Sequence, residues 1–163
     1  MFFISMHFFA AIIGAMKIGI AADHGGFELK NRLTAKLRGQ GYEVTDYGPR
    51  VFDKADDYPD FGAPAARGVA TGEVERAILI CNNGIGMGML ANKIPGVKAA
   101  VVYSESSARD TREHHDSNVL CLGGQEFPPE QLEKFVDIWL GAGFAGGRHA
   151  RRIGKVEALD KNL

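Results

Sequence analysis

Short runs of consecutive apolar residues alternate along this chain with longer segments in which apolar residues recur every three or four positions. Continuous apolar runs are typical of strands buried on both faces of a parallel sheet, whereas the longer spacing is typical of amphipathic helices. The runs predict five strands, at Lys17–Ala22, Tyr42–Asp46, Ala77–Ile80, Val97–Tyr103 and Val119–Leu122.

Helical spacing and helix-ending residues place a helix after each strand. Gly39, for example, ends a segment in which Phe27, Leu29 and Leu33 recur. The predicted helices are Phe27–Arg38, Phe61–Thr71, Met87–Lys93, Ser104–Glu113, Pro128–Leu140 and Arg148–Leu159. The polar segment Gly48–Asp60 is expected to be a surface loop. The alternation predicts a three-layer α/β fold, in which a mostly parallel, five-stranded, Rossmann-like sheet carries helices on both faces.

Residues 1–15 differ from the rest of the chain because they are almost entirely apolar. The segment is shorter than the ~20 residues that a membrane-spanning helix needs, and no positive charge precedes it as in a signal peptide. We therefore expect an N-terminal extension, produced by an upstream start codon or serving an accessory role, outside a working domain at residues 16–163. A targeting segment is the alternative.

Composition narrows the class of partner. The 163 residues carry a formal net charge of −1, which gives no reason to expect nucleic acid or an anionic membrane as a partner. The two cysteines, Cys81 and Cys121, form no disulfide framework, and no Cys/His spacing matches a zinc site. We expect a cytoplasmic protein without a metal.

Residues whose side chains could bind a ligand or act in catalysis follow several predicted strands. Asp23-His24, Asp46, Cys81 and Tyr103-Ser104 come at strand carboxyl ends, which share one edge of a parallel sheet and form its usual ligand site. After Cys81, glycines at positions 84, 86 and 88 let backbone N–H groups approach an anion, and such groups favour a thiolate. The alternative is a tight strand-to-helix turn beside a buried cysteine.

A second group of basic residues lies toward the C-terminus. Arg148, Arg151 and Arg152 begin the last predicted helix, where positive charge opposes the helix dipole, and guanidinium groups suit a phosphate. Subunit pairing or solubility is the alternative role for these arginines. His114 and His115 end the helix after the fourth strand, and they could simply interact with the dipole of that helix. Dinucleotide, P-loop and hydrolase-elbow motifs are absent from the sequence.

Five ordered motifs together resemble one family. They are Ile20–Phe27, Asp57–Pro59, Cys81–Gly86 with Ala91–Lys93, Arg112–Asn118 and Gly146–His149. From about Met16 onward the chain resembles the type B ribose-5-phosphate isomerases, a family that also includes the galactose-6-phosphate isomerase subunits.

The resemblance implies a role for each matching position. Cys81 matches the catalytic base that moves a proton between C1 and C2 of the open sugar, and His114 matches the residue that opens the furanose ring. Asp23 lies near the sugar hydroxyls. The resemblance also implies that the backbone N–H groups of Asn83, Gly84, Ile85, Gly86 and Gly88 stabilise the enediolate, and that the phosphate ligands are His24, Arg148 and Arg152. No cofactor or metal is implied, and the site lies between subunits of a homodimer or tetramer.

Two departures affect the part of the site that faces the sugar. Asn82 and Asn83 replace the family's usual Gly-Thr or Gly-Ser, whose hydroxyl supports a proton relay, and His115 replaces an Asn that contacts the sugar. We expect an isomerase of ribose 5-phosphate and ribulose 5-phosphate. The alternatives are an isomerase of galactose 6-phosphate, allose 6-phosphate or a tetrose phosphate, a non-catalytic sugar-phosphate-binding protein, and a flavodoxin-like nucleotide-binding domain.

Overall fold

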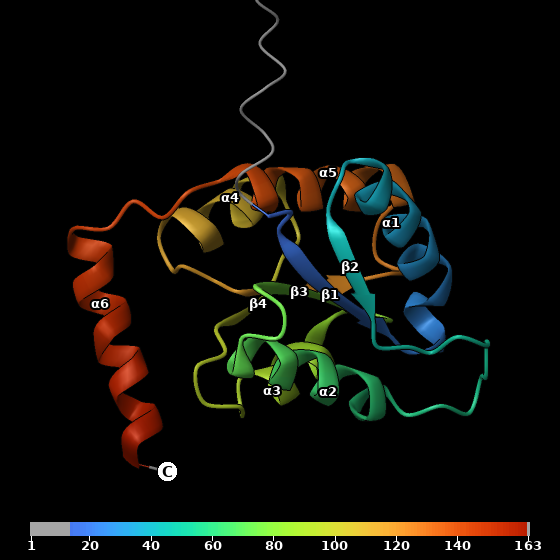
Figure 1. The fold of residues 1–163 in the computed structure, drawn as a ribbon, viewed down its shortest axis with the longest axis horizontal. Coiled ribbons are helices and arrows are strands. Elements are labelled where there is room, and N and C mark those ends of the chain that lie inside the picture. Colours follow the sequence, from blue (N-terminus) through green and yellow to red (C-terminus); the bar gives the residue numbers. More distant parts are fainter. Residues whose placement is uncertain (1–13, 163) are drawn as a thin grey trace, which may run out of the picture.

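The sheet in this computed structural model, which describes residues 14–162, has five strands that all run parallel (Figure 1). In chain order they are β1 (Lys17–Ala22), β2 (Glu43–Asp46), β3 (Arg76–Cys81), β4 (Ala99–Val101) and β5 (Val119–Gly123). Their spatial order is β2-β1-β3-β5-β4, so β1 and β3 lie side by side in the middle of the sheet. The expected extension at residues 1–15 lies almost wholly outside the described residues and stays a prediction.

Helices cover both faces of this sheet. They are α1 (Phe27–Gly39), α2 (Tyr58–Thr71), α3 (Ile85–Ala91), α4 (Glu105–Glu113), α5 (Pro129–Gly141) and α6 (Arg148–Glu157), with short 3₁₀ helices η1 (His24–Gly26) and η2 (Ala158–Asn162). Helices α1, α4 and α5 lie on one face, and α2 and α3 lie on the other (Figure 1). The predicted three-layer α/β class is confirmed. None of the helices in the described part of the chain is long and apolar enough to cross a lipid bilayer.

Several element boundaries differ from the prediction. Helix α2 begins at Tyr58 instead of Phe61, because Pro59 occupies its first turn, where a missing N–H costs nothing. Helix α3 begins at Ile85 instead of Met87. Strand β4 is shorter than predicted because it is an edge strand that pairs only with β5, and Val97 belongs to the turn that precedes it.

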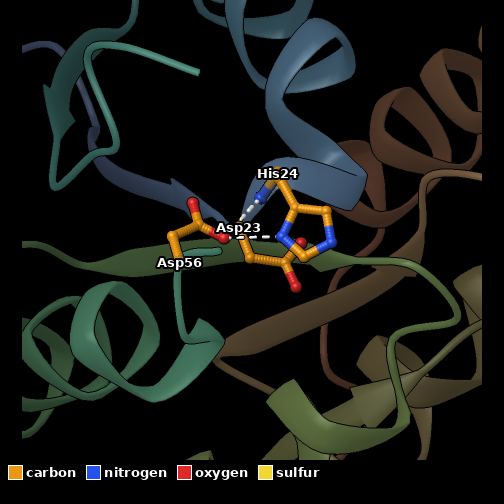
Figure 2. Close-up of side chains that lie close together, drawn as sticks. All are labelled: Asp23, His24 and Asp56. Atoms are coloured by element: carbon orange, nitrogen blue, oxygen red, sulfur yellow. Dashed lines mark hydrogen bonds and ion pairs between the residues drawn. The ribbon is translucent and has the colours of Figure 1, made fainter. Parts of the chain in front are cut away.

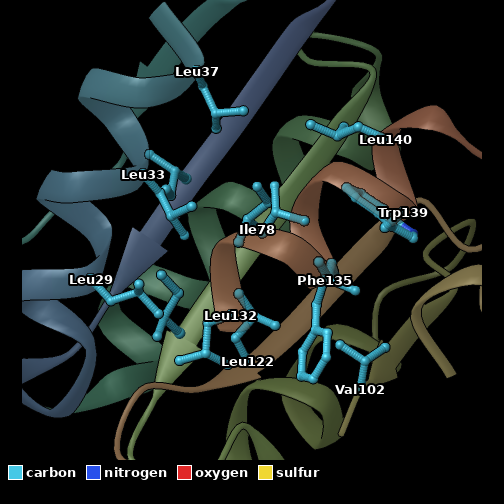
Figure 3. Close-up of a cluster of buried hydrophobic side chains, with 14 of the residues drawn as sticks. Leu29, Leu33, Leu37, Ile78, Val102, Leu122, Leu132, Phe135, Trp139 and Leu140 are labelled. Carbon is cyan, nitrogen blue, oxygen red and sulfur yellow. The ribbon is translucent and has the colours of Figure 1, made fainter. Parts of the chain in front are cut away.

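The larger core lies between the sheet and helices α1 and α5 (Figure 3). Leu29, Leu33 and Leu37, spaced by one helical turn, meet Phe135 and Trp139 of α5 over the strands. The indole Nε1–H of Trp139 donates to Ser117 Oγ at 2.8 Å, so this buried polar group is satisfied.

The smaller core lies on the opposite face and determines where the thiol of Cys81 lies. Side chains alternate along β3, so Leu79 and Cys81 face α2 and α3, whereas Ile78 and Ile80 face α1 and α5. Cys81, the last residue of β3, therefore places its sulfur beneath the beginning of α3.

Helix α6 stands apart from the layers at the end of the chain (Figure 1). It contains no buried residue. The segment before it is attached to the end of α4, because Ala145 N donates to Glu113 O at 2.9 Å. Helix α6 therefore begins near the end of α4.

Candidate active site

Two turns meet at the carboxyl edge of the sheet. Asp23 follows β1 and its N–H donates to Ile80 O of β3 at 3.2 Å. Gly25 lies against the turn after β3, where an added Cβ would come within 2.9 Å of Asn82 N. Only glycine permits this backbone approach. The expected meeting of the Asp23-His24 group with the Cys81 turn is therefore present in the structure.

The Cys81 thiol is almost enclosed, with 4% of the residue exposed. Its Sγ accepts a hydrogen bond from Gly84 N at 3.2 Å. Gly84 adopts a φ of 81°, which a residue with a side chain rarely adopts, and this conformation turns the N–H back toward the sulfur. A donor so placed stabilises negative charge on the sulfur.

The N–H groups of this turn divide into used and free donors. Gly84 N is occupied by Cys81 Sγ, Ile85 N donates to Asn83 Oδ1 at 3.0 Å, and Gly88 N donates to Gly84 O at 3.0 Å. In residues 14–162, no acceptor is present for the N–H groups of Asn83, Gly86 and Met87. Fewer backbone N–H groups in residues 83–88 are therefore free to bind an anion than the sequence resemblance implied.

An aromatic ring covers the first turn of α3. Tyr58, the first residue of α2, packs on Gly86 so closely that an added Cβ would lie 2.7 Å from Tyr58 Cζ. This contact encloses the turn from the side of α2. Tyr58 lies within the family motif Asp57–Pro59, but no role was predicted for it, because only the packing of α2 on α3 brings its ring onto Gly86.

An acidic residue from the β2–α2 loop joins His24 (Figure 2). Asp56 Oδ1 accepts from His24 N at 3.0 Å and from His24 Nδ1 at 2.7 Å. The hydrogen bond to Asp56 raises the pKa of His24, which burial opposes. Next to it, Asp23 Oδ1 accepts from Gly25 N at 2.9 Å, and burial raises the pKa of the Asp23 carboxyl.

His114 lies at the opposite edge of the sheet. Helix α4 starts at the carboxyl end of β4 and carries the chain back, so that Asn118 N donates to Lys98 O and Ala77 N donates to Asn118 O, both at strand beginnings. His114 ends α4 and lies near this amino edge. Within one chain, the structure does not bring His114 to Cys81.

A second cluster of candidate residues forms around His114. The ring of His149 stacks on it, with centroids 4.3 Å apart and planes 8° from parallel. Burial lowers the pKa of His149, and the neighbouring His114, Arg148 and Arg152 lower it further. The ring of His115 lies edge-on to that of His114, with centroids 6.2 Å apart, and it lines a cavity of about 500 Å³ under α6.

Within residues 14–162, two groups of side chains bring oxygen and nitrogen atoms as close together as the ligands of a metal ion. They are Asp23, His24 and Asp56, and Asp110, Glu113 and His114. In the first group, His24 Nδ1 and Asp56 Oδ1 are already bonded to each other. The second is a partly exposed helix end, where acidic groups are common without an ion. We assign no metal to either group.

The fold and the turn after Cys81 define a class of protein. It is a parallel α/β protein that brings a thiol and free backbone N–H donors to the carboxyl edge of its sheet. Such an arrangement suits a small anionic substrate. A family model described as Ribose/Galactose Isomerase matches residues 18–156. The chain belongs to this family.

Individual relatives agree over nearly the whole chain. Ribose-5-phosphate isomerase B of Clostridium thermocellum is 46% identical with a TM-score of 0.88, covering 90% of this chain and 99% of that one. The Mycoplasma genitalium enzyme, solved with bound ribulose-5-phosphate, is 41% identical with a TM-score of 0.88, covering 93% and 100%. Ribose-5-phosphate isomerase B of Escherichia coli is 40% identical over 145 residues, 89% of this chain and 97% of that protein.

Relatives with other substrates in their names also match. The D-erythrulose-4-phosphate isomerase of Pectobacterium atrosepticum is 35% identical over 141 residues, 86% of this chain and 93% of that protein. Family membership therefore narrows the substrate class without selecting one sugar.

Proposed function

We propose that this protein is an aldose–ketose isomerase that interconverts ribose 5-phosphate and ribulose 5-phosphate through an enediolate, as in the pentose phosphate pathway. The observation that carries the proposal is the enclosed Cys81 sulfur beside free backbone N–H groups. A base next to donors for an oxyanion is what removal of a proton beside a carbonyl requires.

In the proposed reaction Cys81 acts as a thiolate. The thiolate takes the proton from C2 of the open-chain aldose, and the C–H electron pair forms the C1=C2 bond while O1 becomes anionic. The free N–H groups of Asn83, Gly86 and Met87 are the donors available to that oxygen. The thiol then returns its proton to C1, and the O2 proton moves to O1 as the C2 carbonyl forms. Asp23 is the buried carboxyl group beside the turn that would contact these hydroxyls.

The phosphate is assigned to His24, Arg148 and Arg152, and ring opening to His114. Within one chain, His24 lies at the carboxyl edge and His114 at the amino edge of the sheet. A site that uses all of these residues therefore needs two copies of the chain, with His114 and the arginines supplied by the second copy. A homodimer is the smallest assembly that meets this requirement, and a tetramer would also meet it.

The test is ketose formation from ribose 5-phosphate by the purified protein. Cys81→Ala should lower kcat by at least about three orders of magnitude while ribose 5-phosphate still binds, because the thiol acts on the reacting carbon. Cys121→Ala is the matched control: this buried thiol lies outside the site, so the variant should be less stable but active. Near-normal turnover by Cys81→Ala would remove the assignment of the base.

A different sugar phosphate is the second candidate function. By the family resemblance, the Asn82-Asn83 turn and His115 belong to the part of the site that faces the sugar, and a tetrose-phosphate isomerase is among the relatives. A panel of four- and six-carbon sugar phosphates, including galactose 6-phosphate and allose 6-phosphate, measures this preference. Binding without conversion across the whole panel would instead identify a non-catalytic sugar-phosphate-binding protein.

A further inference from the structure

Asp56 is an acidic side chain that the proposed reaction does not use. It lies in the loop between β2 and α2, and its side chain is 7% exposed, whereas that of His24 is 37% exposed. The loop is held in place locally, because Asp56 N donates to Asp53 O at 3.1 Å and Ala55 N donates to Asp53 Oδ1 at 2.9 Å. A carboxylate buried to this extent normally needs a cation or several hydrogen bonds.

His24 is the partner that meets this need. One oxygen of Asp56 accepts both from the backbone N–H of His24 and from its ring Nδ1 (Figure 2). These two bonds fix the backbone and the ring of the same residue. Among residues 14–162, the other oxygen of Asp56 has no hydrogen-bond partner, and no lysine or arginine forms an ion pair with Asp56. Among the described residues, the imidazole of His24 is therefore the cationic partner of this carboxylate.

The hydrogen bond to Asp56 also sets the direction of the free ring nitrogen. Because Nδ1 faces Asp56, Nε2 points away from the carboxylate on the far side of the ring (Figure 2). An imidazolium whose Nδ1 proton is held in this way still has one N–H donor and a positive charge for an anion.

We propose that Asp56 is a positioning residue that holds His24 as an imidazolium cation with Nε2 directed at the phosphate of the substrate. The proposal rests on the proposed function, in which His24 is a phosphate ligand. The role of Asp56 adds a pH dependence to phosphate binding. The imidazole of His24 remains a cation at pH values at which a free histidine is neutral.

The neighbouring charges agree with this direction. The hydrogen bond that His24 donates to Asp56 and the negative charge of Asp23 raise the pKa of His24, whereas burial and Lys54 lower it, with a net increase. Glu28 lines the same surface cavity as His24 and adds a further negative charge. A raised pKa means that the protonated form persists to higher pH, so Asp56 should matter most on the alkaline side.

The first test follows the His24 ring directly, by NMR of the imidazole nitrogens in the full-length protein without substrate. Asp56→Asn keeps the shape and an acceptor oxygen but removes the charge, so His24 should titrate at a lower pH than in wild type. Asp57→Asn removes a charge from the adjacent exposed residue, which makes no cap hydrogen bond, and should leave the titration unchanged. An unchanged His24 titration in Asp56→Asn would overturn the proposal.

The wild-type protein also provides a test that needs no variant. His24 should titrate at a higher pH than His149, whose pKa is lowered by burial and by its cationic neighbours. The reverse order would overturn the proposal even if Asp56→Asn failed to fold.

The second test measures the dissociation constant of inorganic phosphate by calorimetry, which does not depend on turnover. Asp56→Asn should weaken binding by about fivefold at pH 8 and by less than about twofold at pH 6, because the lower pH favours the protonated form of His24 in both proteins. Comparison at one pH cancels the ionisation of phosphate itself. Equal weakening at both pH values would show that Asp56 has only a structural role and would overturn the proposal.

His24→Ala separates failure of this inference from failure of the proposed function. If His24→Ala binds phosphate as tightly as wild type, His24 is not a phosphate ligand, and the proposal falls together with that part of the proposed function. If His24→Ala binds phosphate weakly but Asp56→Asn matches wild type at pH 8, only the role of Asp56 is wrong.

Discussion

Arg148 and Arg152 are four residues apart in the first turns of α6, so their guanidinium groups project from one face of the helix. We expect Arg148→Ala or Arg152→Ala to raise the KM for ribose 5-phosphate by about tenfold or more, since a hydrogen bond to a charged group contributes ~1.5–3 kcal/mol. The kcat should change less, because the phosphate is bound in ground and transition states alike.

Steady-state kinetics on the two variants checks this prediction. Arg151→Ala is the comparison variant, because Arg151 is an exposed arginine of the same helix that the family resemblance does not match to the phosphate ligands. An unchanged KM in both Arg148→Ala and Arg152→Ala would remove the phosphate assignment of these arginines.

At the residue scale, side chains next to a strand end were predictable from the sequence, and side chains contributed by distant segments were not. Asp23, His24 and Cys81 lie at the carboxyl ends of neighbouring strands, so their meeting could be expected. Asp56 is 32 residues from His24, and nothing in the linear pattern distinguishes it from the three other aspartates in Gly48–Asp60. The hydrogen bond that Asn83 Oδ1 accepts from Ile85 N also depends on a side-chain direction that sequence does not reveal.

At the element scale, the turn between β3 and α3 can be tested through Gly84. Gly84→Ala places a Cβ 3.0 Å from the carbonyl carbon of Leu122 at a φ of 81°. We expect the free energy of unfolding to fall by more than about 1–2 kcal/mol, the usual cost of a left-handed L-residue. Turnover should fall as well, because the Gly84 N–H that contacts Cys81 Sγ must move.

Gly72→Ala is the matched control for this backbone conformation. Gly72 has a φ of 77° at the end of α2, but an added Cβ would meet nothing within 4 Å. Chemical denaturation should show a loss of about 1–2 kcal/mol with turnover retained. If Gly84→Ala behaved like Gly72→Ala in both measurements, the turn would have no special role in the reaction.

The elements themselves were largely predictable, and their ends and spatial order were not. Continuous apolar runs such as Ala77–Ile80 are typical of strands covered on both faces, so the parallel class could be inferred from them. Right-handed crossovers do not specify which strand lies next to which, and the placement of β5 between β3 and β4 emerged only from the structure. The contact between the ring of Tyr58, at the start of α2, and Gly86 also depends on packing that the sequence does not reveal.

At the scale of the whole molecule, the two clusters of candidate residues are separated by the sheet. The sequence resemblance implied a site shared between subunits. The course of α4 supports this proposal, because the helix returns the chain from the carboxyl edge to the amino edge, so a site that used both Cys81 and His114 would need two chains. Helix α6, which has no buried residue, presents Arg148 and Arg152 beside His114 and away from its own Cys81.

This separation predicts that two inactive variants restore each other's activity. In a mixed dimer of Cys81→Ala and His114→Ala chains, one site carries both substitutions and the other carries neither. Random pairing makes half of the dimers mixed, so refolding the two variants together should recover about a quarter of the wild-type rate. Cys81→Ala mixed with Asp23→Ala is the control, because those residues belong to the same cluster and every mixed site keeps a defect. If the first mixture remained as inactive as the control, Cys81 and His114 would not act across two chains.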